Sequence, residues 1–174
     1  MPISDISATL DSLGISYALI GGRAVVARGH LRATIDFDFL TTDKRVLDPS
    51  SWTSLEGAEI DARKGDYDDQ LKGVVHIRLS DGSDADVIVG KWKWEQAVID
   101  RAERIVAGPL NVPIPRVSDL VLLKLAAGGP LDLQDILNLL EIHGVDKVVP
   151  EVEAHIDEVR PDVRQTWKDL LASR

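Results

Sequence analysis

The sequence predicts an α+β fold, with mixed helices and strands to about residue 115 and helices alone after it. Residues 34–40 alternate apolar and polar side chains, which is typical of a strand, and 74–89 read as a strand hairpin. From Ser118 onward, capping residues and Gly or Pro breaks delimit a series of helices. We therefore expect a core over 1–115 and a helical region over 116–174 packed on it.

Composition and charge restrict the function classes. The 174 residues contain no cysteine, no apolar run long enough for a membrane span, and no basic start typical of a secretory signal. We expect a cytoplasmic protein that is not bound in a membrane. The 20 basic residues are outnumbered by 29 acidic ones, giving a net charge of −9. Duplex DNA is an improbable partner, because its binding depends on neutralising phosphates with Lys and Arg.

Glycines and turn signals mark the elements of the first part. Gly14 and Gly29 end two short helices, and Ser80–Ser83 joins the hairpin strands. Residues 41–72 are polar and irregular, with Trp52 as an anchor, and could form a lid, an inserted strand pair or a partner surface. The expected elements are a helix from Ser4 or Asp5 to Leu13, strands over 15–20 and 34–40, a helix over 23–28, strands over 74–79 and 85–89, a helix over 93–101, and short strands or a connector over 104–115 containing Gly108-Pro109.

The last third contains four helix patterns. Ser118 can cap the first, Gly128 to Pro130 break the chain, and Asp132 is a natural N-cap for the second. Two prolines suit the first turns of the others. The expected helices cover 118–127, 132–143, 150–159 and 161–172.

Asp36 and Asp38 are the leading candidates for chemistry. In a strand, residues two apart point to the same face, and their Cα atoms are about 6.6–6.8 Å apart. These carboxylates would therefore point one way, while Ile35, Phe37 and Phe39 point into the core. Carboxylate oxygens are the ligands that hard cations prefer. The alternative is a solvated face of an edge strand, but aspartate is depleted in strands.

Asp86 offers a third carboxylate. It lies in the strand that ends Val87-Ile88-Val89, and it would face Asp36 and Asp38 if that strand pairs beside theirs. Three carboxylates around two Mg²⁺ ions would suit a phosphoryl displacement. On its own, Asp86 reads equally well as a solvent-facing strand residue.

Gly21-Gly22 supplies a turn between a strand and a helix. Free backbone N–H groups at such a turn suit phosphate, although most Gly-Gly pairs are simply turns. Arg23 beside it could contact phosphate or only cover the surface. Lys124 is the one charge within the apolar helix 120–127, where the ordinary outcome is that its amine reaches solvent.

Together, the Gly21-Gly22 turn, Asp36-Phe37-Asp38 and the later Asp86 strand resemble the nucleotidyltransferase superfamily typified by DNA polymerase beta. The stretch from 19 to 40 is similar to small bacterial nucleotidyltransferase-like proteins related to abortive-infection toxins. In that group a Gly-Gly-x-Ala turn precedes Arg-x-Thr-x-Asp-x-Asp, and a helical Lys precedes Asp-x-x-Asp. The matching residues are Arg32, Thr34, Asp36, Asp38, Lys124, Asp132 and Asp135.

The resemblance implies a mixed sheet flanked by helices and transfer of a nucleoside monophosphate from an NTP. It implies that Asp36, Asp38 and Asp86 hold Mg²⁺ or Mn²⁺, with Asp86 also accepting a proton, and that Gly21, Gly22, Arg23 and Lys124 hold the nucleotide. The acceptor would be an RNA end such as that of tRNA, a protein hydroxyl or a small molecule. An antitoxin protein is the partner that a toxin role implies.

Two departures from the family pattern keep an alternative open. Arg23 follows Gly22 where the family often has Ser and a basic residue, and 126–131 lacks the usual basic residues. The alternative is a protein that kept the fold as a binding or interaction module and lost the chemistry.

Overall fold

The computed structural model describes residues 2–107 and 110–173, so the expected Gly108-Pro109 turn lies outside the described residues. The chain forms two compact units. The first consists of Met1–Ala24 and Ala33–Pro115, and the second of Val25–Arg32 and Arg116–Arg174. Residues 25–32 thus fall in the helical unit, although the sequence led us to place them in the core. Packing of the helical region on the core stays a prediction.

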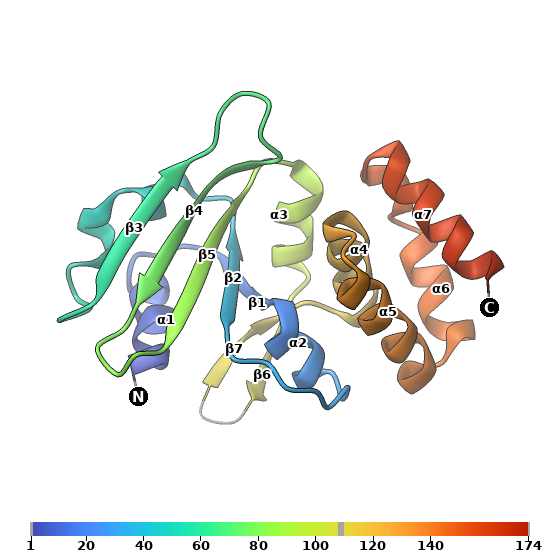
Figure 1. Ribbon diagram of the computed structural model, residues 1–174, viewed down its shortest axis with the longest axis horizontal. Coiled ribbons are helices and arrows are strands. Elements are labelled where there is room, and N and C mark those ends of the chain that lie inside the picture. Colours follow the sequence, from blue (N-terminus) through green and yellow to red (C-terminus); the bar gives the residue numbers. More distant parts are fainter. Residues whose placement is uncertain (1, 108–109, 174) are drawn as a thin grey trace. The chain divides into compact units, whose positions relative to one another are not determined.

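A five-stranded mixed sheet forms the centre of the first unit (Figure 1). The strand order is β1-β2-β5-β4-β3, in which only β2 and β5 are parallel neighbours. Strands β6 and β7 form a separate antiparallel pair. The strands are β1 Tyr17–Ile20, β2 Phe37–Thr41, β3 Glu59–Lys64, β4 Leu71–Arg78, β5 Asp84–Gly90, β6 Glu103–Ala107 and β7 Leu110–Ile114.

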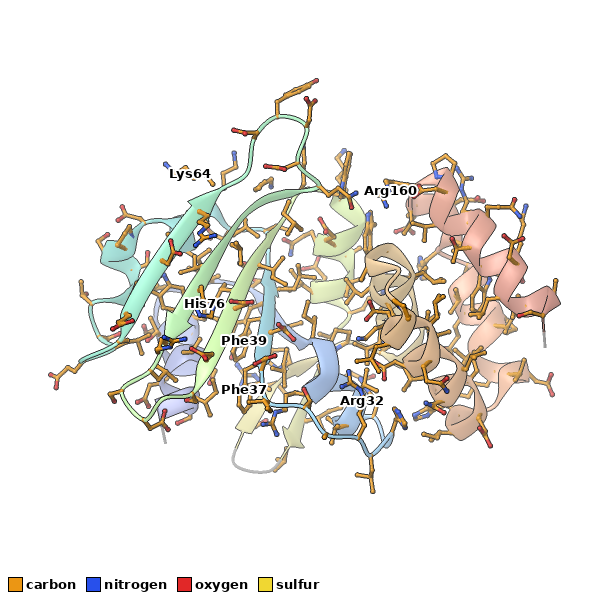
Figure 2. The ribbon with its side chains drawn as sticks, in the orientation of Figure 1. Arg32, Phe37, Phe39, Lys64, His76 and Arg160 are labelled. Carbon is orange, nitrogen blue, oxygen red and sulfur yellow. The ribbon has the colours of Figure 1, made fainter. Side chains whose placement is uncertain are left out.

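The two faces of this sheet differ in chemistry because side chains alternate along each strand. One face is apolar: Phe39, Val75 and Val87 are fully buried on it. The other face carries polar side chains, among them Asp86 and the labelled His76 in Figure 2. The sheet is thus anchored by one face and presents its acids on the other.

Helices complete the first unit. Gly14, at the expected stop of the first helix, has a φ of +63°. The Trp52 anchor is confirmed, since its ring is buried and its Nε1 donates to the Val46 carbonyl at 2.8 Å. The helices are α1 Pro2–Ser12, α2 Gly21–Ala27, whose last three residues belong to the second unit, and α3 Lys93–Asp100, with 3-10 helices η1 Lys44–Leu47 and η2 Pro49–Trp52.

One expectation for the first unit is corrected, and one open alternative is decided. The strand expected over 34–40 begins only at Phe37, because its partners β1 and β5 pair with residues 37–41 alone. Ile35 is therefore 84% exposed rather than part of the core. Of the alternatives for residues 41–72, an inserted strand is present: β3 lies at the edge of the sheet and pairs with β4.

The second unit is built from four helices and residues 25–32. Its core is apolar and includes Leu122, Ile136, Leu140 and Trp167. The helices are α4 Val117–Ala127, α5 Pro130–His143, α6 Val145–Glu153 and α7 Pro161–Ala172, with η3 Ile156–Glu158 between the last two. No helix among the described residues is both long and apolar enough to cross a membrane.

Three helix starts differ from expectation. Helix α4 begins at Val117 with Arg116 at its N-cap, so Ser118 lies inside the helix and is not its cap. Helix α5 begins at Pro130, so Asp132 occupies its third position rather than the N-cap, and its carboxylate accepts from the Gly129 N–H at 3.1 Å. Helix α6 begins at Val145 and contains Pro150 in its interior. The start at Val145 follows Gly144, whose φ of +89° ends α5 directly before it.

Candidate active site

The candidate site centres on Asp38 and Asp86, which lie opposite each other on paired strands. Asp38 of β2 is the register partner of Asp86 of β5, and the two strands run parallel. Register partners point to the same face of a sheet, and neighbouring strands lie about 4.7–4.9 Å apart. The structure therefore brings these two aspartates together on the polar face, because the two strands pair, which was the condition that the sequence left open.

Asp36 is placed differently from the prediction. It lies one residue before β2 and is exposed, so it does not share a strand face with Asp38. The reason is the short ladder: neither β1 nor β5 pairs with residues before 37. Thr34 lies in the same irregular segment. Asp36 is thus close to Asp38 along the chain, without the fixed orientation that a strand imposes.

Gly21 lies directly against the Asp38 carboxylate. Ile20, the last residue of β1, pairs with Asp38, and the chain then turns at Gly21 with a φ of +65°. A Cβ atom at Gly21 would lie 1.9 Å from Asp38 Oδ2. Only glycine fits here, because both the backbone conformation and the space exclude a side chain. The Gly21 turn and the strand that carries Asp38 are therefore packed directly against each other.

Arg23 holds the segment that carries Asp36. Its guanidinium carbon lies 4.4 Å from the centre of the Phe37 ring, and NH2 donates to the Ile35 carbonyl at 3.3 Å. These contacts to both neighbours of Asp36 give the side chain a structural role in the first unit. Phe37, labelled in Figure 2, is half-buried beneath this guanidinium.

His76 is a site residue that the sequence reasoning missed. It is the register partner of Asp86 on β4, and its Nδ1 lies 2.7 Å from Asp86 Oδ1. Its Nε2 lies 3.6 Å from Asp84 Oδ1, which also accepts from Arg78 Nε at 3.0 Å. The hairpin register could have revealed it, because counting back from the Ser80–Ser83 turn places His76 opposite Asp86.

The second unit holds the remaining candidates in one network of charges. Arg32 donates from Nε and NH2 to the two oxygens of Asp135 at 2.8 and 2.9 Å, in a bidentate pair. Lys124 Nζ lies 2.6 Å from Asp132 and 2.9 Å from Asp135. His30 approaches Asp135 at 3.8 Å. The side chain of Asp135 is fully buried.

The network has a consequence for protonation. Burial alone would raise the pKa of Asp135, but the hydrogen bonds and charges of Arg32 and Lys124 outweigh it, so the pKa lies below its ordinary value. Asp135 is therefore an anion that balances two cations. The Lys124 amine is turned inward to these acids and does not reach out to solvent: its side chain is only 10% exposed.

Asp38 and Asp86 fit a hard divalent cation in their chemistry, since both offer carboxylate oxygens from one face of paired strands. Asp36 is exposed and adjacent in the chain. Over residues 2–107 and 110–173, no three His, Cys, Asp or Glu side chains are gathered as a ready metal site. The carboxylate oxygens of Asp38 and Asp86 are of the kind that Mg²⁺ or Mn²⁺ prefers. The position of Asp36 is not fixed by the strand.

No protein-family model and no curated protein matches the chain. Solved structures do. The solution structure of the antibiotic-resistance factor ANT(2'')-Ia matches with a TM-score of 0.60 and 17% identity, over 99% of this chain and 92% of that one. A crystal structure of ANT(2'')-Ia in complex with adenylyl-2''-tobramycin gives 0.56 and 19%, over 89% and 95%.

A third solved structure agrees. The lincosamide antibiotic adenylyltransferase LnuA, with lincomycin bound, matches with a TM-score of 0.51 and 16% identity, over 79% of this chain and 94% of that one. At such identities the likeness establishes architecture. Taken with the mixed sheet and the paired aspartates, it shows that the chain has the nucleotidyltransferase fold.

Proposed function

We propose that this protein is a nucleotidyltransferase that moves a nucleoside monophosphate from an NTP to a hydroxyl acceptor, using Mg²⁺ or Mn²⁺. One observation carries the proposal: Asp38 and Asp86 are register partners on parallel strands, with the Gly21 turn pressed against the Asp38 carboxylate. A strand pair with opposed aspartates on its polar face is costly without a role, because like charges side by side repel. The nucleotidyltransferase fold supports the same reading.

The reaction assigns a role to each residue. The acceptor oxygen attacks the α-phosphorus, the bond from that phosphorus to the bridging oxygen breaks, and pyrophosphate leaves with the electron pair. Asp86 accepts the proton of the attacking hydroxyl. Asp36 and Asp38 would hold the cation, which supplies positive charge against the phosphates. The backbone of Gly21 and Gly22 faces the triphosphate.

Three further groups act as positioning residues in this scheme. His76 holds the Asp86 carboxylate through the 2.7 Å hydrogen bond. Arg23 fixes the segment before β2 through Ile35 and Phe37. Lys124 and Arg32, with Asp132 and Asp135, keep the segment 25–32 ordered in the helical unit.

Small molecules are the acceptor class that the solved neighbours favour, since the bound molecules named for them are adenylyl-2''-tobramycin and lincomycin. An RNA end such as that of tRNA and a protein hydroxyl are the other acceptors, and a toxin acting on either would have an antitoxin partner. A cytoplasmic location fits all three, because NTPs are found there.

The test is label transfer. Purified protein with Mg²⁺ or Mn²⁺ is incubated with each α-labelled NTP and with aminoglycosides, lincosamides, tRNA or protein acceptors. We expect transfer that Asp38→Asn and Asp86→Asn abolish. The matched control is Asp61→Asn, which should retain activity. Asp61 is an exposed aspartate of β3 that lies on the same polar face of the sheet as Asp38 and Asp86.

A second function has specific support: Asp36 lies outside the strand and the described residues contain no ready metal cluster. A fold that binds nucleotide without chemistry would bind NTP by calorimetry and transfer no label. If neither binding nor transfer occurs with any acceptor, the enzyme proposal is overturned. Recovery of a stable protein partner would then favour an interaction role.

A further inference from the structure

A pocket of about 550 Å³ lies in the first unit, away from the paired aspartates. Its lining comes from η1, η2, the end of β3 and the start of β4. Three of the lining side chains are lysines: Lys44, Lys64 and Lys72. Leu47 and Pro49 add apolar surface, and Asp48 is the one acid.

The pocket lies on the apolar face of the sheet, opposite to the candidate active site. Lys64 pairs with Gly73 on β4, and Val75 and Ile77, which share that face with Gly73, are fully buried. Figure 2 shows Lys64 at the C-terminal end of β3. His76 lies on the opposite, polar face of the sheet, beside Asp86. A ligand here would not compete with one at Asp38 and Asp86.

An irregularity in β4 brings Lys72 into the pocket. The register with β5 shifts between Leu71 and Gly73, so Lys72 is the extra residue of a β-bulge. A β-bulge changes the direction in which a side chain points, and bulges are frequent next to functional sites. Gly73 beside it admits the close approach of η1, since a Cβ there would lie 2.8 Å from Leu47 Cδ2.

The charges of this pocket are unbalanced. Within the described residues, none of the three lysines lies within salt-bridge distance of a carboxylate, although the chain has nine more acids than bases. Arg63, next to Lys64, is paired with Asp61 at 2.6 Å. The Asp48 carboxylate accepts a hydrogen bond from the Ser50 N–H, which, with a smaller effect from the charge of Lys64, keeps the pKa of Asp48 below its ordinary value. The charge of Lys72 acts on Glu95, whose pKa is nevertheless raised by burial. Like charges around one pocket repel, and an anion between them relieves that repulsion.

We propose that this pocket binds a small organic phosphate, with Lys44, Lys64 and Lys72 around the phosphate and the surface of Leu47 and Pro49 against the organic part. Its volume falls within the range of about 300–1,000 Å³ typical of small-molecule sites. Ammonium groups are established phosphate binders. The site is independent of the nucleotidyl transfer proposed above.

The experiment is a ¹⁵N-NMR titration of the full chain with ADP, pyrophosphate and succinate, in the Asp38→Asn background and without divalent cations. We expect ADP to shift the amides of Gly65 and Lys72, pyrophosphate to do so more weakly, and succinate to do so least. The triple variant K44Q/K64Q/K72Q should bind ADP at least tenfold more weakly. The matched control K93Q/K147Q/K168Q removes three exposed lysines elsewhere and should stay within about twofold of the parent.

Two outcomes would overturn the proposal. One is that ADP shifts only amides around Gly21 and Asp38, which would place the ligand at the candidate active site. The other is that both triple variants weaken binding equally, which would make the effect one of net charge. Because Asp38→Asn is present throughout, loss of nucleotidyl transfer leaves this test unaffected.

Discussion

At the scale of single residues, the site depends on how closely its parts approach one another. Gly21 leaves no room for a methyl group beside Asp38 Oδ2, and His76 Nδ1 lies 2.7 Å from Asp86 Oδ1. In each contact a carboxylate lies against a neighbour to which the proposed mechanism gives no reacting role. Such neighbours decide whether a site is correctly placed, since a misplacement of about 1 Å can lower a rate about 10²-fold.

Replacing Gly21 with alanine tests the first contact. We expect Gly21→Ala to lower the free energy of unfolding by about 1–3 kcal/mol and to displace Asp38, so that Mn²⁺ binding measured by calorimetry weakens. Gly14→Ala is the matched control, because Gly14 has nearly the same φ of +63° with nothing within 4 Å of the added Cβ. Equal Mn²⁺ affinities in the two variants would contradict the role assigned to Gly21.

His76 is tested by a pair of substitutions. We expect His76→Ala to reduce kcat about tenfold with little change in KM for NTP, because a hydrogen bond to a charged group contributes about 1.5–3 kcal/mol. His76→Asn keeps a donor and should recover part of the rate. Steady-state kinetics of label transfer measures both. A change confined to KM would show that His76 acts on substrate binding instead.

At the scale of elements, the segment that follows α2 is fixed by the helices of the second unit. His143 Nε2 lies 2.6 Å from the Arg28 carbonyl, His30 lies 3.1 Å from Asn138, and Arg32 forms the bidentate pair with Asp135. Asp36 is the fourth residue after Arg32 along the chain. These contacts therefore hold residues 28–32 within the helical unit.

Arg32→Lys removes the bidentate hydrogen bonds to Asp135 and keeps the positive charge. We expect hydrogen exchange of the amides of 28–33 to rise about tenfold, while the cores of α4 and α5 keep their protection. Arg164→Lys is the control, because Arg164 makes a single contact with the 87% exposed Asp157. Exchange that rises equally throughout α5 would indicate a general loss of stability rather than release of the segment.

At the scale of the whole molecule, the buried carboxylate of Asp135 links stability to pH. Its pKa in the folded protein is below the unfolded value of about 3.9, so its contribution is present above about pH 4 and is lost as the pH falls through the folded pKa. Removing one partner of a buried ion pair typically costs about 3–5 kcal/mol. The two cations, Arg32 and Lys124, would be left without their shared partner.

We expect Asp135→Asn to be less stable than the parent protein by about 3 kcal/mol at pH 7, by urea unfolding. The difference should shrink as the pH is lowered from 4 to 2. The exposed Asp157→Asn should show a much smaller difference at every pH. A difference for Asp135→Asn that stays constant over this range would mean that the carboxylate charge is not what stabilises the network.

The sequence by itself determined the class of fold and most of the elements. The alternation around Phe37 to Phe39, the hairpin turn at Ser80–Ser83 and the glycine stops at Gly14 and Gly128 are local signals, and local backbone preferences act on them directly. The sequence allowed Asp86 to face Asp38 on condition that their strands pair, and the structure meets that condition.

The tertiary structure decided what depends on partners distant in the sequence. It started β2 at Phe37 and left Asp36 outside, because the neighbouring strands offer no pairing there. It turned Lys124 inward to Asp132 and Asp135, and it brought Lys44, Lys64 and Lys72 to one pocket. Which elements meet determines how many residues pair between two strands, which charged groups form ion pairs and which side chains line a pocket. Local sequence patterns do not predict which elements meet.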